Sequence, residues 1–305
     1  MIPNRRIVEL ALDVGFDACG VSLARKLEGE EMHFSSWIQN GYQAEMGYMV
    51  RNRDLRMDTT LLVPNSKSVI SILYSYNRSD LPVFTETPKI SRYALGPDYH
   101  NVVKKYLYEL LTRIRLEFGD VNGRAFVDSA PVLERAWATS SGLGWVGKNS
   151  NLINSSLGSF VFIAELIVDA DIEPTTLAVA DRCGNCTRCI DACPTGAIVS
   201  PRVIDSGKCI SYTNIEKKTP LSAREYSSLH GWCFGCDICQ EVCPWNKKAR
   251  IIDHSRLQSK HLNGITPDKL SGLTKEQFDE LFGNTPLTRA GYDKVTSAIR
   301  MMLTE

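Results

Sequence analysis

Two cysteine runs decide the fold of this chain: C-G-N-C-T-R-C-I-D-A-C-P at Cys183–Pro194 and C-F-G-C-D-I-C-Q-E-V-C-P at Cys233–Pro244. Both runs have the spacing C-x2-C-x2-C-x3-C-P, and together they hold eight of the ten cysteines. A ninth, Cys209, lies between them. In a reducing compartment, where disulfides do not persist, cysteines grouped in this way indicate metal binding. The stretch therefore predicts a metal-binding module over residues 176–250.

Two kinds of metal centre use closely spaced cysteines. Zinc sites are built from C-x2-C pairs, and they need two such pairs for each ion. Here each run has three cysteines at C-x2-C-x2-C spacing and a fourth followed by proline. This is the spacing with which two-cluster bacterial ferredoxins hold a pair of [4Fe–4S] clusters. The spacing favours two [4Fe–4S] clusters over zinc.

In the two-cluster arrangement, the first three cysteines of one run share a cluster with the last cysteine of the other run. The first cluster would be bound by Cys183, Cys186, Cys189 and Cys243. The second needs Cys193, Cys236, Cys239 and one more thiolate. The spacing alone selects Cys233 for that place and leaves Cys209 as an unexplained thiol beside the clusters.

The remaining composition is ordinary for a globular protein. The chain has 305 residues, a formal net charge of zero and 43% hydrophobic residues. No apolar run approaches the roughly 18 residues that cross a bilayer, and the N-terminus lacks an apolar signal core. We therefore expect a cytoplasmic protein without a membrane partner, and a monomer. Residues 182–260 carry twelve Lys and Arg against seven Asp and Glu, an excess that suits a polyanion or simply a solvated surface.

Hydrophobic periodicity predicts the elements before the cysteine runs. A helix carrying Ile7 and Val14 should end near Gly15, and the further expected elements are a strand over 68–76, a helix over 103–118 and strands over 124–127 and 159–168. Proline in Asp128-Ser-Ala-Pro131 predicts a helix start there. The expected fold class is an α/β (α+β) domain over 1–175, the ferredoxin-like module over 176–250, and a short helical segment over 251–305. Candidate helices in that last segment span 273–282 and 292–303.

Several motifs around the cysteines occur together. They are F-V-D-S-A-P-V-L-E-R-A-W at 126–137, G-L-G-W-V-G-K-N at 142–149, G-S-F at 158–160, C-I-S-Y at 209–212 and C-D-I-C-Q-E-V-C-P-W-N at 236–246. With them the chain resembles the epoxyqueuosine reductases, the cobalamin-dependent iron–sulfur enzymes of tRNA queuosine biosynthesis. The resemblance extends over about residues 1–300.

The resemblance implies a reaction and its cofactors. The family reduces the epoxide of epoxyqueuosine at the wobble position of tRNA to the cyclopentene of queuosine, which is the last step of queuosine biosynthesis. Two electrons and two protons are consumed and water is released. The implied cofactors are a cobalamin and two [4Fe–4S] clusters, and the implied partners are a tRNA with a queuosine-type anticodon loop and an unidentified electron donor. In such enzymes the cofactor supplies the difficult chemistry, while the protein positions and protonates the substrate.

The resemblance also implies a different ligand for the second cluster. In the family this ligand comes from the C-I-S-Y motif, so Cys209 would join Cys193, Cys236 and Cys239. Cys233 is then a departure from the family pattern, a buried thiol near the clusters.

Asp128 matches the proton donor of the family. Donation to the leaving oxygen needs a neutral carboxylic acid, so we expect its pKa to be raised by burial against the cobalamin. The alternative from the local sequence is that Asp128 caps the helix expected at Pro131, as aspartates often do.

Further positions lie on family-like motifs and would surround the cobalamin or its tail. They are Arg56, Tyr93, Lys148, Asn149, Ser211 and Asp237. Lys217 is a candidate contact to tRNA phosphate, with a solvated lysine as the alternative. Longer family members continue into helical repeats that help to grip tRNA. The sequence ends at Glu305, so we expect a short form without that repeat domain.

Two other functions remain open from the sequence. One is a different cobalamin and iron–sulfur reductase, such as a reductive dehalogenase acting on a small molecule. The other is an electron-transfer protein of the ferredoxin type, whose first domain only docks partners.

Overall fold

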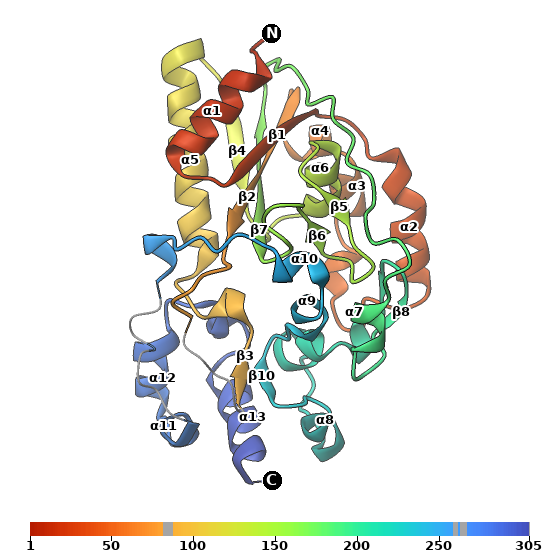
Figure 1. Cartoon of the computed structure of the whole chain (residues 1–305), viewed down its shortest axis with the longest axis vertical. Helices are drawn as coiled ribbons and strands as arrows, with labels where there is room; N and C mark the ends of the chain where they lie inside the picture. The colour runs from red at the N-terminus through yellow and green to blue at the C-terminus, as the bar shows by residue number, and fades with distance from the viewer. Residues whose placement is uncertain (82–87, 259–261, 263–266, 305) are drawn as a thin grey trace.

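The computed structural model describes residues 1–81, 88–258, 262 and 267–304. Its main element is a four-stranded antiparallel sheet with the order β1-β2-β7-β4 (Figure 1). The strands are β1 (Ala18–Leu23), β2 (Ser68–Ser75), β4 (Gly123–Phe126) and β7 (Val161–Val168). The three strands expected from the sequence are confirmed, and β1 is an addition. Because all three strand pairs are antiparallel, the domain is of the α+β kind.

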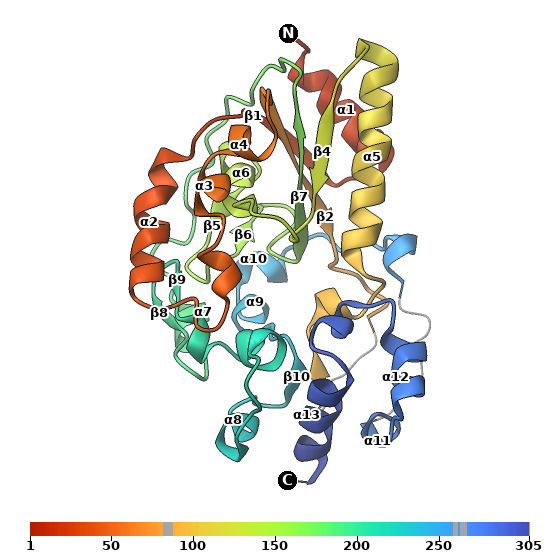
Figure 2. The same ribbon diagram turned by 180° about the vertical axis from the view of Figure 1, so that it is seen from behind.

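Helices cover both faces of this sheet. α1 (Asn4–Val14) and α5 (Tyr99–Phe118) pack on one face, and α6 (Glu134–Ser140) packs on the other (Figures 1 and 2). β2 is therefore buried at every residue, which explains its nearly continuous apolar and small side chains. α1 ends where Gly15 adopts a φ of 112°, as the sequence predicts.

The cysteine runs follow the sheet domain and form a layer of short elements, which lies below the sheet in the view of Figure 1. These elements are α7 (Arg188–Asp191), β8 (Ile198–Ser200), β9 (Val203–Ile204), a π-helix η4 (Tyr212–Glu216), α8 (Ala223–Ser227), β10 (Trp232–Phe234), α9 (Ile238–Glu241) and α10 (Pro244–Lys247). α7 and α9, which follow equivalent cysteines in the two runs, pack against each other. This repeat matches the two-cluster ferredoxin arrangement expected from the spacing.

The C-terminal segment joins the cysteine module through a shared core. Its helices are α11 (Pro267–Ser271), α12 (Lys275–Phe282) and α13 (Tyr292–Thr304), with a 3-10 turn η7 (Pro286–Arg289) before α13. Strand β3 (Lys89–Ile90), from the first part of the chain, pairs in parallel with β10. Phe278 and Phe282 pack into the same core as Phe234. The division at residues 175 and 250 stays a prediction, but the core contacts cross both boundaries.

The remaining elements lie around these cores. They are α2 (Glu28–Gln39), η1 (Gly47–Met49), α3 (Arg53–Met57), α4 (Thr59–Leu62), η2 (Arg92–Ala94), β5 (Trp145–Val146), β6 (Leu152–Ile153), η3 (Ser206–Lys208) and η5 (Ser255–Leu257). Among the described residues, no helix combines the length and the apolar character that a membrane span requires.

One expected helix start is wrong. α6 begins at Glu134, after Leu133, and not at Pro131. Asp128 has a φ of +53°, a left-handed conformation, and does not cap this helix. The strained turn instead directs the chain away from β4 and leaves the Asp128 carboxylate available to other partners.

Candidate active site

The cysteines proposed for the first cluster line one cavity of about 220 Å³. Its walls include Cys183, Cys186, Cys189 and Cys243. The turns of the first run hold the thiols in place, since the Cys186 amide donates to the Cys183 carbonyl over 3.0 Å. The space between these thiols is therefore preformed by the fold.

The cysteines proposed for the second cluster also gather. Burial raises the pKa of Cys236 to about 12, and the charges of Cys209 and Cys193 add to the rise. Burial likewise raises the pKa of Cys239, with contributions from Cys236 and Cys209. Four thiols from both runs and from the C-I-S-Y motif thus lie within electrostatic reach of one another.

Cys233 lies apart from them. It is in β10 with an exposed fraction of 0%, inside the apolar core around Phe234. Its thiol donates to the carbonyl of Lys89 over 3.3 Å. Burial raises its pKa to about 12, so the thiol is neutral and inert. This geometry favours Cys209 over Cys233 as a cluster ligand.

The two sets of thiols are not arranged around single metal-ion positions. In the described part of the chain, no three His, Cys, Asp or Glu side chains are close enough to hold a single metal ion. A zinc site would bring its sulfurs to about 2.3 Å from one ion. A [4Fe–4S] core instead takes one thiolate at each of four irons, and the spread of the cysteines fits this larger group.

Asp128 lies at the end of β4 beside the N-terminus of α5. Its Oδ2 accepts a hydrogen bond from the Tyr99 hydroxyl over 2.6 Å. Its backbone amide donates to Glu134 Oε1 over 2.5 Å. The Asp128 side chain is nevertheless 63% exposed. It is therefore oriented by neighbours yet open to a reacting group.

His100 is the second member of this site, and its role was not assigned from the sequence. Its Nε2 lies 3.8 Å from Asp128 Oδ2, and its Nδ1 lies 2.7 Å from Asp98 Oδ1. Burial lowers the pKa of His100, but the contacts with Asp128 and Asp98 outweigh this and raise it to about 9. Asp98 caps α5, because its carboxylate accepts the His100 amide. The same Asp98 carboxylate thus caps the helix and contacts the His100 imidazole.

The sequence predicts a raised pKa for Asp128 when the carboxyl is buried against cobalamin, and this stays a prediction. In the structure, desolvation by the surrounding protein raises the pKa of Asp128 even though 63% of the side chain is exposed. His100 and the Tyr99 hydroxyl outweigh this effect and hold the pKa of Asp128 below its usual range. These neighbours therefore favour a charged His100 and an ionised Asp128 at neutral pH.

Two further carboxyls lie behind Asp128. Burial and the charge of Asp128 raise the pKa of Glu134 to about 8. Glu165, on β7, is 0% exposed, and neither of its oxygens has a hydrogen-bond partner within the described part of the chain. Burial and the charge of Glu134 raise its pKa well above the usual range. Both glutamates are thus biased toward the neutral acid.

Tyr93 lies within electrostatic reach of Asp128, and Asp237 lies within electrostatic reach of the second set of cysteines. Asp237 lies between Cys236 and Cys239 in sequence, and its carboxylate accepts from the Ser91 hydroxyl and from the Arg92 amide, each over 2.7 Å. Burial raises the pKa of Asp237. Burial and the charges of Asp128 and Asp237 raise that of Tyr93. Asp237 therefore holds the turn that carries Tyr93, and its own oxygens are engaged.

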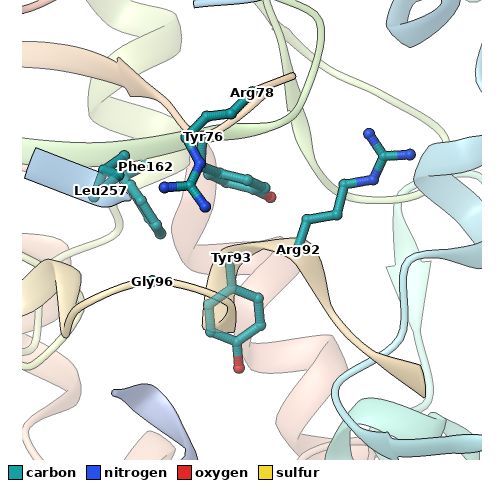
Figure 3. Close-up of a pocket in the computed structure, with 7 residues that line it drawn as sticks. All are labelled: Tyr76, Arg78, Arg92, Tyr93, Gly96, Phe162 and Leu257. Carbon is teal, nitrogen blue, oxygen red and sulfur yellow. The ribbon is translucent and has the colours of Figure 1, made fainter. Parts of the chain in front are cut away.

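A small pocket lies beside Tyr93. Figure 3 shows Tyr76 and Tyr93 on its walls, with Arg78 beside them. Its volume of about 10 Å³ holds at most one water, so it is not a cofactor site. Arg56 lies elsewhere, on α3. It is buried and donates from Nη2 to the Tyr48 carbonyl over 3.1 Å, while its Nε has no partner among the described residues.

The other predicted cofactor residues lie against the cysteine module. Lys148 donates to the Gly184 carbonyl over 2.7 Å, and Asn149 donates to the Cys239 carbonyl over 3.2 Å. Both line the cavity of the first cysteine set. Ser211 follows Cys209, and its amide hydrogen-bonds the Cys209 thiol. All three residues therefore contact the cysteine module.

Lys217 is already paired. Its ammonium contacts the Glu225 carboxylate, and this hydrogen bond raises the pKa of Lys217. Its carbonyl accepts from Lys294 of α13. To bind a tRNA phosphate, Lys217 would have to break its ion pair with Glu225.

Arg289 reaches the site from the C-terminal segment and was not predicted. It forms two hydrogen bonds of 3.0 Å with Glu216 at the end of the π-helix. Its guanidinium lies 5.9 Å from the centre of the Tyr48 ring. Its charge contributes to lowering the pKa of Asp128. No local sequence signal marks Arg289, because its neighbours come from distant parts of the chain.

Comparison with known proteins identifies two matching families. Residues 182–246 match the 4Fe-4S double cluster binding domain, and residues 56–129 match the family described as "Epoxyqueuosine reductase QueG, DUF1730". The first match covers both cysteine runs and confirms the double-cluster prediction. The second covers the segment from Arg56 past Asp128.

Full-length relatives give the same assignment. The chain is 49% identical over 271 residues to an epoxyqueuosine reductase of Cellulophaga algicola, covering 89% of this chain and 86% of the relative. It is 45% identical over 286 residues to the one of Leadbetterella byssophila, covering 94% and 93%. The family resemblance expected from the motifs is thereby confirmed, and a dehalogenase or a simple ferredoxin is not favoured.

Solved structures agree in fold. The chain superimposes on a selenomethionine-labelled epoxyqueuosine reductase with a TM-score of 0.90 at 28% identity, covering 98% of this chain and 80% of that chain. A second match, with a TM-score of 0.89 at 27% identity and the same coverages, is an epoxyqueuosine reductase with an epoxyqueuosine-modified tRNA-Tyr stem loop. The chain belongs to the epoxyqueuosine reductase family.

Proposed function

We propose that this chain reduces the epoxide of epoxyqueuosine in tRNA to the alkene of queuosine. Two electrons and two protons enter, the two carbon–oxygen bonds of the epoxide break, and the oxygen leaves as water. The observation that carries the proposal is the Asp128–His100 pair, in which His100 Nε2 lies 3.8 Å from Asp128 Oδ2 and the Tyr99 hydroxyl hydrogen-bonds the same oxygen. Membership of the family supplies the substrate.

The chain's residues fit the implied clusters. Cys183, Cys186, Cys189 and Cys243 would hold the first [4Fe–4S] cluster around the 220 Å³ cavity. Cys193, Cys209, Cys236 and Cys239 would hold the second, and the Ala197 amide would donate to the Cys193 sulfur, as it does here over 3.3 Å. Such amide–sulfur bonds tune the reduction potential of a cluster.

Cobalamin fits the surroundings of Asp128. The unpartnered Nε of Arg56 is a buried donor that a polar group of the cofactor would satisfy. The Asp128 side chain is 63% exposed and Tyr93 is half-buried, so both are open to a group bound beside them. Cobalamin, when bound, supplies a strongly reducing and nucleophilic cobalt centre.

Protons come from this chain's own residues. His100 holds a proton at neutral pH and lies beside Asp128. Tyr99 fixes one oxygen of Asp128 and so sets the direction of the carboxyl. His100 would pass this proton to Asp128, and Asp128, as the neutral acid, would pass it to the leaving oxygen of the epoxide. His100 is thus the source and Asp128 the donor.

The substrate nucleotide must leave the stacked anticodon loop to reach Asp128. Loop bases of RNA can be splayed into a protein pocket at low cost, so one nucleotide is accessible in this way. Arg289 acts electrostatically on Asp128 and lies 5.9 Å from the Tyr48 ring, so Arg289 and Tyr48 are candidates for contacting the substrate nucleotide.

The test uses protein reconstituted with clusters and cobalamin, excess dithionite and epoxyqueuosine-containing tRNA. Mass spectrometry of digested tRNA should show queuosine. Asp128→Asn should keep its iron and cobalamin spectra and lose about 10²–10⁴-fold in rate, whereas the exposed Asp120→Asn should react like the wild type. Persistence of the epoxide with fully loaded enzyme would rule the function out.

A further inference from the structure

We propose that the rim of the first-cluster cavity is the docking surface for a small acidic one-electron carrier protein. This inference rests on the proposed function, because it needs a cluster in that cavity.

All charged residues that line the cavity of the first cysteine set, apart from the cysteines themselves, are cations. Its charged lining consists of Lys148, Arg182, Arg188 and Lys248, with no aspartate or glutamate. Arg182, Arg188 and Lys248 are exposed. For these three, no hydrogen bond or ion pair of the side chain is found among the described residues, while Lys148 donates to a backbone carbonyl. A cluster with four thiolates is anionic and balances part of this charge, but the three exposed groups face solvent.

The acidic residues that neighbour the rim in the sequence form no ion pair with it in the described part of the chain. Asp181 is paired with Arg202, and Asp191 accepts from the Thr187 hydroxyl over 2.7 Å. Glu241 is exposed on α9. Like charges held together without partners repel one another, so an acidic partner that binds here gains electrostatic energy and is steered to the site.

The position of the rim in the electron path selects the kind of partner. The second cysteine set is the one tied to the catalytic site, because Asp237 hydrogen-bonds the turn that carries Tyr93. The first set lines the cavity with the exposed rim. Electrons that enter at the rim therefore reach the first cluster, then the second, then the site of Asp128.

Aromatic side chains add an apolar element to the same place. Trp245 lines the cavity and is half-buried, and it packs edge-on against Trp145 with ring centres 5.0 Å apart. An apolar patch with a rim of exposed charge is typical of transient protein interfaces. Each encounter transfers one electron: the carrier is oxidised, the cluster is reduced, and no bond or proton changes place. Two encounters supply one turnover.

Reduced flavodoxin, an acidic one-electron carrier, is the probe. The holoenzyme variant R188E/K248E should lower the second-order rate of cluster reduction by about tenfold or more at low ionic strength. Its affinity for flavodoxin, measured by calorimetry, should fall in parallel. The wild-type rate should fall steeply with added salt, and that of the variant should not. R188K/K248R keeps the charge and should keep the rate.

The matched control is K104E/K105E, which reverses two exposed cations on α5, away from the cysteine module. It should react with flavodoxin like the wild type. Iron content and turnover with excess dithionite are measured for every variant, and reduction rates are compared per bound cluster, which separates the two proposals. If the wild type fails with dithionite, the proposed function fails. If dithionite turnover is normal and R188E/K248E accepts electrons from flavodoxin as fast as the wild type, the docking surface is wrong.

A nucleic-acid role for the rim is an outcome of the same experiment. If R188E/K248E loses tenfold or more in tRNA affinity by gel shift while reduction by flavodoxin is unchanged, the surface binds the substrate and the proposal is overturned.

Discussion

His100 places Nε2 3.8 Å from Oδ2 of Asp128 while its Nδ1 contacts Asp98 over 2.7 Å. An imidazole between two carboxylates is stabilised in its charged form, and this raises the pKa of His100 to about 9. The same contact keeps Asp128 ionised. The proton needed for the reaction is therefore stored on His100 and not on Asp128.

The first prediction concerns His100→Gln. The wild-type rate should fall above about pH 9, as His100 loses its proton. The variant lacks the stored proton, so its single-turnover rate at pH 7.5 should drop about 10²-fold and its falling limb should move to lower pH. Single-turnover rates from pH 6 to 10 test this, with the exposed His33→Gln as control. An unchanged pH profile would show that His100 is structural.

The second prediction concerns Glu165, which is buried and has no hydrogen-bond partner among the residues that the structure describes. Its folded pKa is raised well above the usual value, so folding takes up a proton that the unfolded chain releases. The contribution of Glu165 to the free energy of unfolding is complete below the unfolded-state pKa of about 4.3. As pH rises from there toward the folded-state pKa, the protein loses about 1.4 kcal/mol of stability per pH unit. Glu165→Gln removes this loss.

Thermal unfolding midpoints of the holo-protein provide the measurement. As pH rises from 5.5 to 8.5, the thermal midpoint of the Glu165→Gln variant should rise relative to that of the wild type. The exposed Glu173→Gln should show no such trend. A gap between Glu165→Gln and wild type that is constant with pH would mean that Glu165 is ionised in the folded protein.

The third prediction separates the two candidate thiols. Cys209→Ala should lose close to half of the bound iron, because it removes a thiol from the second set. Cys233→Ala should keep all iron, because this thiol points to the Lys89 carbonyl in the core of β10. Iron analysis and electron paramagnetic resonance after reconstitution decide between them. The reverse pattern would restore the regular spacing of the second run.

The fourth prediction tests how the sheet domain holds the cysteine module. Gly158 has a φ of +69°, and an added Cβ would lie 2.2 Å from Asn246 Oδ1. That oxygen accepts the Ser159 amide over 2.6 Å, and Asn246 donates back to the Ser159 hydroxyl over 2.9 Å. Gly158→Ala should break this contact and destabilise the protein by more than about 1 kcal/mol.

Thermal midpoint and iron content measure the effect of Gly158→Ala. Gly29→Ala is the matched control, since Gly29 lies in helix α2 with negative φ and open space around it. That substitution should be neutral or slightly stabilising. Equal midpoints for the two variants would contradict the proposed role of the Gly158 contact.

The sequence alone determined the cofactor module, the family and most of the sheet domain. Cysteine spacing is a local, one-dimensional signal, and the strands at 68–75 and 161–168 are apolar runs that periodicity detects. The motif from Phe126 to Trp137 pointed to Asp128. The helix start at Pro131 was wrong because proline is equally suited to the turn that leaves β4.

Only the tertiary structure decided the protonation of the site and its outer members. The pKa of Asp128 depends on His100 and Tyr99, which α5 brings to the end of β4. Arg289 joins them from the C-terminal segment. Likewise the regular spacing of the second run selects Cys233, whereas the fold buries that thiol in β10 and gathers Cys209 with the other three. Electrostatic interactions act through space, and spacing along the chain does not contain the distances on which they depend.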